Sequence, residues 1–521
     1  MDRIQATYIA TRPDRDPETL GRAIALEQSV EVIEELVTPE IRESLVGRVE
    51  SVEARGDEKY RITVSYAPEV AAGQVGQLFH LLFGNISFYP RLKLVDVTLP
   101  PAVTGQLHGP RYGIDGIRLA TGIGQRPLLC TALKPRGSSV EHLARLAGEF
   151  ARGGGDLLKD DQNLVHEDFE SFKHRVDACA TAVERANDQT GRRCLYLPHV
   201  AGSGSRLLRQ LEFVHRRNLP GVLLCPLVMG LETAGRMAAD FDLMYMAHPA
   251  MAGALTEPED HGIASGVLLG TLARVSGADI SIFPGKGGRI SAALSECRDV
   301  VDLLTCPFNG LHATMPCPAG GKTLDMLEDM GREYGPDCAI LIGGDLLKSG
   351  DRLAEVTGQS IGKLAGLYGE QQHAPAEWRM SSCELPGMQI SALKHYLRKN
   401  PDFEWDGRES QLYKDDDTLP FKGVRRVELM GNNGEQMNFD LRYFELAPGG
   451  YTSLEKHLHT HVIIGARGTG TLVLDDTHKP LGEHDLAYIE PLAVHQLKNE
   501  SDEPFGFYCL VDRDRDRPMG P

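Results

Sequence analysis

The chain has 521 residues, and its 73 acidic and 55 basic side chains give a net charge of −18. Its 41% hydrophobic and 25% charged residues are typical of a globular protein. Because domains usually have about 100–200 residues, the length predicts two to four domains. The acidic balance argues against nucleic acid and anionic membranes as partners. Because we find no signal peptide, membrane-spanning run or CxxC pair, we expect a cytoplasmic protein with reduced thiols.

Residues 1–115 form the first predicted domain. The segment Lys59–Tyr66 alternates apolar and polar side chains, as a half-buried strand does. The segment Val75–Phe83 has the apolar spacing of a helix. We therefore expect an α+β domain of ferredoxin-like fold.

Residues 116–370 form the second predicted domain, in which short apolar runs alternate with helical segments. The runs are Leu128–Leu133, Leu157–Lys159, Cys194–Pro198, Val222–Pro226, Leu243–Ala247, Ile280–Phe283, Thr314–Cys317 and Ala339–Ile342. Eight strand–helix units within about 250 residues predict a (β/α)8 barrel, whose active site lies at the C-terminal ends of its strands. The alternative is an open doubly wound sheet, but no strand precedes a dinucleotide-type glycine fingerprint.

The rest of the chain changes in character. Residues 371–424 are polar and irregular, and we interpret them as a linker and lead-in. Residues 425–521 carry short alternating stretches separated by Gly, Pro and Asp, which predict an all-β domain. The stretches are Leu441–Leu446, Val462–Ile464, Thr471–Leu474 and Gly506–Val511.

A lysine followed by acidic side chains ends the second predicted barrel strand, in the segment GGGDLLKDDQN around Lys159. A protonated lysine is a poor metal ligand, but its carbamate, formed with CO2, is an oxygen donor suited to Mg²⁺. With a nearby carboxylate, the ion could then stabilise an enediolate. The alternative is a salt-bridged loop without metal, and the residues alone leave both readings open.

This segment resembles the carbamylated-lysine motif of the RuBisCO large-chain family, and other segments match that family in the same order. The resemblance implies Mg²⁺ ligands at Lys159, Asp161 and Gln162. TALKPRG resembles the motif of the proton-abstracting base, which implies that role for Lys134. MAHPAMAG and FPGKGG resemble the fifth-strand motif and the mobile sixth loop. They imply catalytic roles for His248 and Lys286.

Two more pairs of motifs extend the resemblance. LFGNISF around Asn85 and IALEQSVE around Glu27 resemble segments that act across a subunit interface, which implies a homodimer with shared substrate sites. AGG and IGGD resemble the backbone phosphate cradles after the seventh and eighth strands. The implied phosphate-binding residues are Ala319, Gly320, Gly321, Gly343 and Gly344.

The departures from the family pattern are informative. Gln162 stands where a second carboxylate ligand is expected, Pro249 replaces an arginine for the distal phosphate, and the region 279–283 lacks a histidine. The chain therefore resembles a form IV RuBisCO-like protein rather than a CO2-fixing enzyme. Such relatives keep enolisation or proton transfer on phosphorylated sugars.

The all-β domain carries a cluster of histidines. Glu455, His457, His459 and His461 alternate along the chain, so on a strand they would share one face, and His495 follows downstream. Imidazoles grouped in this way suit a divalent transition metal such as Mn, Fe, Ni or Zn. The alternative is a set of solvent-facing histidines.

The two segments around these residues resemble the two motifs of the cupin family. They are PGGYTSLEKHLHTHVIIGARGTG and GEHDLAYIEPLAVHQLKN. The resemblance places His461 where the family has glutamate, and Glu455 and His457 at its two first histidine positions. His495 is the later histidine, and His459 is an additional side chain.

Together the two resemblances imply a bifunctional enzyme of methylthio (methionine) salvage. The barrel would isomerise 5-methylthioribulose 1-phosphate to 1-methylthioxylulose 5-phosphate by Mg²⁺-assisted proton transfer. The cupin would then remove the methylthio group to give 1-deoxyxylulose 5-phosphate, with glutathione or another thiol as acceptor. Cys509 could take part, although an inert buried thiol is favoured.

Two other readings stay open. One is a different RuBisCO-like enolase or decarboxylase that acts on a 3-oxo sugar-acid phosphate, with the cupin as an auxiliary isomerase. The other is a sugar-binding sensor on a degenerate barrel, which Gln162 and Pro249 favour. The complete set of Lys134, Lys159, Asp161 and Lys286 argues against the sensor.

Overall fold

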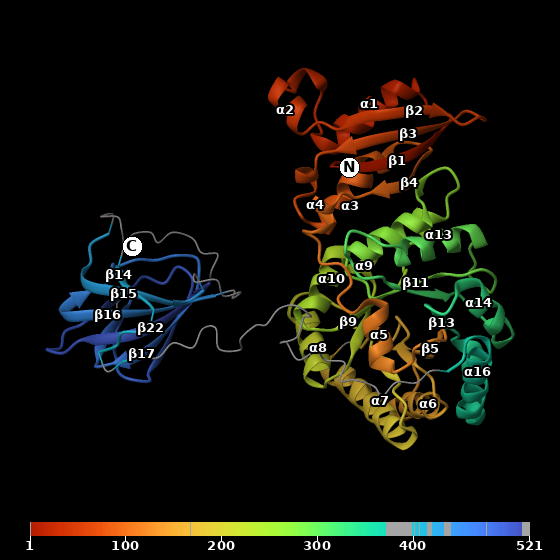
Figure 1. Cartoon of the computed structure of the whole chain (residues 1–521). Helices are drawn as coiled ribbons and strands as arrows, with labels where there is room; N and C mark the ends of the chain where they lie inside the picture. The colour runs from red at the N-terminus through yellow and green to blue at the C-terminus, as the bar shows by residue number, and fades with distance from the viewer. Residues whose placement is uncertain are drawn as a thin grey trace. The chain divides into compact units, whose positions relative to one another are not determined.

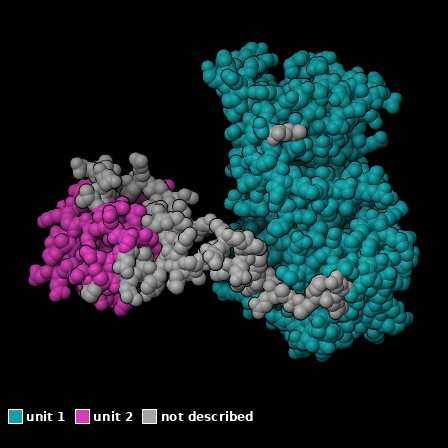
Figure 2. Space-filling view, in the orientation of Figure 1, with its two compact units in different colours: residues 1–382 teal, residues 383–521 magenta. Residues whose placement is uncertain are grey.

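The computed structural model describes residues 2–166, 168–370, 399–400, 402–405, 407–413, 419–431, 439–475 and 477–512. The chain divides into two compact units, residues 1–382 and 383–521, which Figure 2 colours separately. Much of the predicted linker, residues 371–398, lies outside the described residues. Within the described part of the chain, no helix is long and apolar enough to span a bilayer.

The N-terminal domain has the expected α+β architecture (Figure 1). Its elements are β1 (Ile4–Thr11), α1 (Pro17–Ser29), α2 (Pro39–Ser44), β2 (Arg48–Ala54), β3 (Lys59–Tyr66), α3 (Val75–Phe83) and β4 (Leu92–Thr98). The antiparallel order β4-β1-β3-β2, with α1 and α3 as crossovers, is the ferredoxin-like topology. The predicted strand and helix are confirmed as β3 and α3.

The eight predicted apolar runs each form a barrel strand. These are β5 (Leu128–Leu133), β6 (Leu157–Asp160), β7 (Leu195–Leu197), β8 (Gly221–Leu224), β9 (Met244–Ala247), β11 (Ile280–Pro284), β12 (Met315–Ala319) and β13 (Ala339–Leu341). They pair in parallel as β13-β5-β6-β7 and β12-β11-β9-β8. The Leu223 N–H, which donates to the Pro198 carbonyl at 2.9 Å, links the two halves between β7 and β8.

Helices cover the outside of this barrel (Figure 1). They are α6 (Val140–Arg152), α7 (Phe169–Thr190), α8 (Gly204–Arg216), α10 (Leu231–Asp240), α13 (Leu294–Thr305), α14 (Leu327–Tyr334) and α16 (Leu353–Tyr368). The helix α5 (Gly113–Thr121) belongs to the interior, because its buried Ile117 packs in one core with Leu128, Met244 and Met315. The strands are therefore buried on both faces, which explains their continuous apolar runs.

A short strand joins the barrel to the N-terminal sheet. β10 (Gly262–Ile263), which follows β9, pairs in parallel with β4. The Lys93 ammonium also donates to the Pro258 carbonyl at 2.6 Å. The sequence did not predict this connection, because two residues are too few to show a periodic pattern.

The C-terminal unit is a nearly closed antiparallel β barrel. Its strands are β14 (Ser410–Leu412), β15 (Lys422–Met430), β16 (Phe439–Tyr451), β17 (His461–Arg467), β18 (Gly470–Leu474), β19 (Thr477–Leu481), β20 (Leu486–Ile489), β21 (His495–Lys498) and β22 (Phe505–Asp512). The four predicted stretches are confirmed within β16, β17, β18 and β22. β14 and the first residues of β15 lie in the segment expected to be lead-in, and both pair with this sheet.

Candidate functional site

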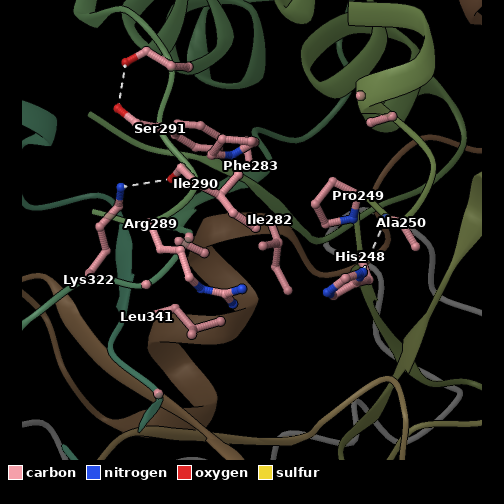
Figure 3. A pocket seen from close by; sticks show the side chains of 18 of the residues that line it. His248, Pro249, Ala250, Ile282, Phe283, Arg289, Ile290, Ser291, Lys322 and Leu341 are labelled. Carbon is pink, nitrogen blue, oxygen red and sulfur yellow. Dashed lines mark hydrogen bonds between the residues drawn. The ribbon is translucent and has the colours of Figure 1, made fainter. Parts of the chain in front are cut away.

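The largest described pocket of the barrel lies at the C-terminal ends of its strands and has a volume of about 1020 Å³. It is lined by residues that follow β5, β6, β9, β11, β12 and β13. Parallel strands bring their carboxyl ends to one rim, so side chains that are far apart in the sequence meet there. Figure 3 shows part of this lining.

Two lysines and one carboxylate meet at one side of the pocket. The Lys134 ammonium lies 3.0 Å from Asp161 Oδ2. Burial lowers the pKa of the Lys159 ammonium, which donates to the Asp160 carbonyl at 2.9 Å. Burial also raises the pKa of the Asp161 carboxyl, but the Asn163 N–H and Lys134 outweigh this and lower it overall. The site thus holds a carboxylate beside an amine that loses its proton more readily than a free lysine does.

The two adjacent aspartates have different roles. Asp160 is fully buried and accepts hydrogen bonds from Arg175, from the Tyr196 hydroxyl at 2.9 Å and from the His199 N–H at 2.9 Å. Asp161 lines the pocket together with Gln162. Of these two aspartates, Asp161 therefore faces the pocket, and its role as an Mg²⁺ ligand stays a prediction. Asp160 holds the neighbouring strand ends together through its hydrogen bonds.

His248 and Pro249 form another part of the wall (Figure 3). The Nδ1 atom of His248 accepts the Ala250 N–H at 3.1 Å. Burial, with the nearby Lys159, lowers the pKa of His248 to about 3. Its imidazole is thus neutral near pH 7, with its Nε2 atom as the hydrogen-bond donor.

All five residues of the two predicted phosphate cradles line the pocket. Gly320 and Gly321 have φ angles of +105° and +75°, and a Cβ on Gly320 would lie 2.2 Å from the Ile290 carbonyl oxygen. Gly343 has a φ of −93°, and a Cβ there would lie at the ordinary contact distance of 3.6 Å from Lys134 Nζ. Of the two loops, it is therefore the one at Gly320–Gly321 whose backbone requires glycine.

The predicted loop lysine lies outside the pocket lining. The Lys286 ammonium pairs with Glu333 at 2.5 Å, and its side chain is 52% exposed. The same loop instead places Arg289 in the pocket, where Figure 3 shows its guanidinium extending into the cavity. A role for Lys286 against substrate stays a prediction, and it requires the loop to move.

Sequence reasoning missed Arg289 and also Lys322. Lys322 is 2% exposed and donates to the Gly285 carbonyl at 2.8 Å and to the Gly287 carbonyl in the loop before Arg289. The position of Arg289, three residues after the loop lysine, was the available signal. For Lys322 the sequence offers no signal, because its partners are backbone carbonyls.

The predicted interface residues bind each other in the N-terminal domain. The Asn85 amide donates to Glu27 Oε1 at 3.0 Å, and neither residue lines the barrel pocket of its own chain. Phe88, three residues after Asn85, is 89% exposed. Their action on a neighbouring subunit stays a prediction.

The second pocket lies inside the cupin-like barrel and has a volume of about 230 Å³. All five predicted metal ligands line it, but the expectation of a single strand is wrong. β17 begins only at His461, because the chain bends at residues 458–459. The ring of His457 donates from Nδ1 to the His459 carbonyl at 2.7 Å, a contact that an extended strand does not allow.

Three histidines converge despite that bend. The ring nitrogens available for a metal in His457, His461 and His495 lie within 4.8 Å of one another, and the Nε2 atoms of His461 and His495 are 3.1 Å apart. His495 Nδ1 donates to the Ala493 carbonyl at 2.9 Å, as His457 does to His459, so Nε2 is the unprotonated nitrogen in both. This orientation is typical of metal-binding histidines.

The protonation of these rings suits a cation. Burial and the neighbouring histidines lower the pKa of His461 to about 2 and that of His457 to about 4. Neutral imidazoles keep the lone pairs that a metal needs. The residues present therefore fit a divalent transition ion.

Two predicted ligands flank this trio. The ring of His459 stacks on that of His457 with centroids 3.6 Å apart. Glu455 accepts a short hydrogen bond from Ser453, whose hydroxyl lies 3.1 Å from the Tyr413 hydroxyl. His459 and Glu455 are thus beside the cluster rather than at its centre.

Family comparisons agree with both parts of the fold. Residues 113–288 match the ribulose bisphosphate carboxylase large chain, catalytic domain, and residues 442–511 match the cupin domain. These ranges contain Lys134, Lys159 and His248 in the first case and the three clustered histidines in the second.

Individual relatives match the first unit. A ribulose bisphosphate carboxylase-like protein 1 of Rhodopseudomonas palustris is 39% identical over 70% of this chain and 98% of its own length. A 5-methylthioribulose-1-phosphate isomerase of Rhodospirillum rubrum is 36% identical over 70% of this chain and 97% of its own length. The crystal structure of a Rubisco-like protein from Rhodopseudomonas palustris aligns with a TM-score of 0.63 at 37% identity, over 70% of this chain and 98% of that one.

Proposed function

This chain belongs to the RuBisCO large-chain family, as a form IV RuBisCO-like protein with a C-terminal cupin domain. We propose that it catalyses two steps of methionine salvage. The barrel isomerises 5-methylthioribulose 1-phosphate to 1-methylthioxylulose 5-phosphate. The cupin then removes the methylthio group to give 1-deoxyxylulose 5-phosphate. The observation that carries the first step is the pair Lys134–Asp161 beside the buried Lys159, in a pocket that is also lined by the glycine loops after β12 and β13.

The barrel residues have separable tasks in this proposal. Mg²⁺, held by carbamylated Lys159, Asp161 and Gln162, would stabilise negative charge on the substrate oxygens. The isomerisation moves the carbonyl from C2 to C4 of the substrate, which takes two successive enolisations through C3. Lys134 takes a proton from one carbon and returns it to the next in each enolisation, so the isomerisation gains and loses no atoms. Its amine is held at the pocket wall by Asp161 and lies close to Gly343. The neutral His248 donates a hydrogen bond from Nε2 to a substrate oxygen.

The phosphate of the substrate binds to the glycine backbone. The N–H groups around Gly320–Gly321 and Gly343–Gly344 are donors that need no side chain. Arg289 adds a positive charge beside the first cradle, because a Cβ on Gly321 would lie 2.8 Å from Arg289 Cβ.

The cupin step is a group transfer to a thiol such as glutathione. The thiol sulfur bonds to the methylthio sulfur, the carbon–sulfur bond of the sugar breaks, and the sugar carbon takes the proton that the thiol gives up. The products are a mixed disulfide and the deoxy sugar, so the atoms and electrons balance. A divalent ion on His457, His461 and His495 would polarise the adjacent carbonyl.

A product analysis tests both steps in one experiment. The full chain is incubated with 5-methylthioribulose 1-phosphate and glutathione in D2O, and products are followed by NMR while bound metals are measured. We expect deuterium in 1-methylthioxylulose 5-phosphate and then 1-deoxyxylulose 5-phosphate. Unchanged turnover in Lys134→Ala contradicts the barrel mechanism. Activity on a 3-oxo sugar-acid phosphate instead supports the decarboxylase alternative.

The protein also acts as a homodimer in this proposal. Glu27 and Asn85 match residues that act on a neighbouring subunit in the family, and the adjacent Phe88 presents an apolar ring to solvent in the single chain. Light scattering should give twice the chain mass, and a monomer with full activity contradicts the shared site.

A further inference from the structure

We propose that Arg442 and Arg426 form an oxyanion subsite inside the cupin pocket, which binds the phosphate group of a sugar phosphate. Both arginines line the 230 Å³ pocket together with the histidine trio. The subsite itself stands on the geometry of the pocket. The identity of its ligand as a sugar phosphate rests on the proposed function.

The two arginines project from neighbouring strands onto one face of the sheet. In the pairing of β15 with β16, Arg426 lies opposite Phe444 and Arg442 lies opposite Glu428. Because side chains alternate along a strand, Arg426 and Arg442 therefore point to the same side, as does Cys509, which lies opposite Arg442 on β22. That side is the interior of the barrel.

Arg442 is poorly satisfied by the protein. Its Nε atom is buried without a hydrogen-bond partner, and its Nη2 atom reaches Cys509 Sγ at 3.7 Å. Sulfur is a weak acceptor. Among the described residues, no carboxylate forms an ion pair with Arg442, whose guanidinium carbon lies 5.2 Å from the ring centroid of Phe444. A buried guanidinium in this state is costly unless a ligand supplies the missing acceptors.

Arg426 is held in place by its neighbours. Its Nη1 atom donates to the Tyr413 carbonyl at 3.3 Å and its Nη2 atom to Gln411 Oε1 at 3.0 Å, while Glu428 Oε1 lies 3.6 Å away. Its Nε atom, like that of Arg442, is buried without a partner. Arg426 is thus a fixed donor, and Arg442 is the cation whose charge the pocket leaves uncompensated.

The charge of the pocket favours an anion. Imidazole rings carry no negative charge whether or not they are protonated, and Glu455 is the carboxylate among the lining residues. Arg426 has Glu428 beside it at 3.6 Å, so Arg442, with a divalent ion where one is bound, supplies the positive charge that exceeds the charge of Glu455. Arginine forks match phosphate oxygens in geometry and bind them through two hydrogen bonds at once. A phosphate is therefore the ligand that satisfies both the charge and the free donors.

Binding of inorganic phosphate to the full chain tests the subsite. Calorimetric titrations are compared for the wild type, Arg442→Gln, Arg442→Lys and Arg467→Gln. Arg467 is the matched control, because it belongs to the same domain, pairs with Glu445 at 2.9 Å and does not line the pocket. The same chain loaded with Co²⁺ in excess Mg²⁺ gives a second readout, since phosphate next to the histidine site changes the visible spectrum of cobalt.

We expect Arg442→Gln to weaken the phosphate-dependent change in the cobalt spectrum at least tenfold. Arg442→Lys should retain part of it, Arg467→Gln should match the wild type, and calorimetry should still detect phosphate at the barrel in every variant. A wild-type cobalt response in Arg442→Gln overturns the subsite. A response to S-methylglutathione but not to phosphate overturns the phosphate assignment.

Two checks keep the result interpretable. Cobalt content and thermal unfolding show whether Arg442→Gln still folds, and a folded Arg442→Lys with no phosphate response shows that the fork is needed as well as the charge. Formation of 1-deoxyxylulose 5-phosphate and the mixed disulfide separates this inference from the proposed function. A wild type that binds phosphate beside cobalt but forms neither product retains the subsite and loses the proposed chemistry.

Discussion

The barrel pocket and the cupin pocket bring their functional side chains together from different distances along the sequence. The barrel collects charged groups, Lys134, Lys159, Asp161 and Arg289, from the ends of strands that are up to 155 residues apart (289 − 134 = 155). The cupin takes two of its three clustered histidines from one five-residue stretch, 457–461, and the third from β21. A parallel barrel brings distant strand ends to one rim, whereas an antiparallel barrel needs only one bend and one partner strand.

The two pockets also differ in charge state. Oxygen ligands and lysines in the barrel suit the hard cation Mg²⁺ and an anionic intermediate. Buried, neutral imidazoles in the cupin suit a borderline transition ion. The two pockets therefore offer different donor atoms, and two metals bound there would not compete for the same ligands. Each prediction below tests whether the two pockets act independently.

Lys134→Ala should have the largest effect. Loss of a general base lowers the isomerisation rate by about 10²–10⁴-fold, while the cupin metal content stays at the wild-type level. NMR of the sugar phosphates measures the rate, and Lys363→Ala on the exposed side of α16 is the control. A fall in cupin metal in Lys134→Ala would break the independence of the two pockets.

His461→Ala should remove the cupin metal and leave the barrel active. Removal of a residue that only supports a metal ligand lowers metal affinity by roughly 10–100-fold. Removal of one of the three ligands themselves should lower it further. Elemental analysis after dialysis measures the content, with the exposed His478→Ala as the control. Retention of one metal per cupin would show that Glu455 and His459 can replace His461.

Arg289→Gln should raise the KM of the barrel for its phosphorylated substrate. A charge-assisted hydrogen bond contributes about 1.5–3 kcal/mol, which corresponds to about a 10–100-fold increase in KM. Steady-state kinetics measure it against Arg332→Gln, whose guanidinium pairs with Glu328 and lies outside the pocket. An unchanged KM would leave phosphate binding to the glycine backbone alone.

Gln162→Glu should have the smallest effect and the opposite sign. A carboxylate in place of the amide adds a charged oxygen ligand, so we expect Mg²⁺ to bind about tenfold more tightly, because ligand charge tunes the affinity of such sites. The Mg²⁺ dependence of isomerisation measures this, and Gln359→Glu, on the surface of α16, is the control. Equal Mg²⁺ affinity would place the ion away from residue 162.

Much of the architecture could be predicted because it follows from apolar periodicity. All eight barrel strands and the four β stretches of the cupin are confirmed, since buried strands need continuous or alternating apolar residues whatever surrounds them. Lys322 and β10 could not be predicted, because their partners are backbone carbonyls and a strand distant in sequence. The single strand expected at 455–461 is wrong, because the chain bends at residues 458–459, where His457 Nδ1 donates to the His459 carbonyl.

The sequence by itself determined the classes of chemistry: a lysine–carboxylate motif at a strand end, glycine cradles, and a dense group of histidines. Only the tertiary structure decided which members act together. It assigned Asp160 to a buried brace and Asp161 to the pocket, turned Lys286 toward Glu333, and brought Arg289 inward. The reason is physical: residue type sets what a side chain can bind, but burial and neighbours from other strands set what it faces.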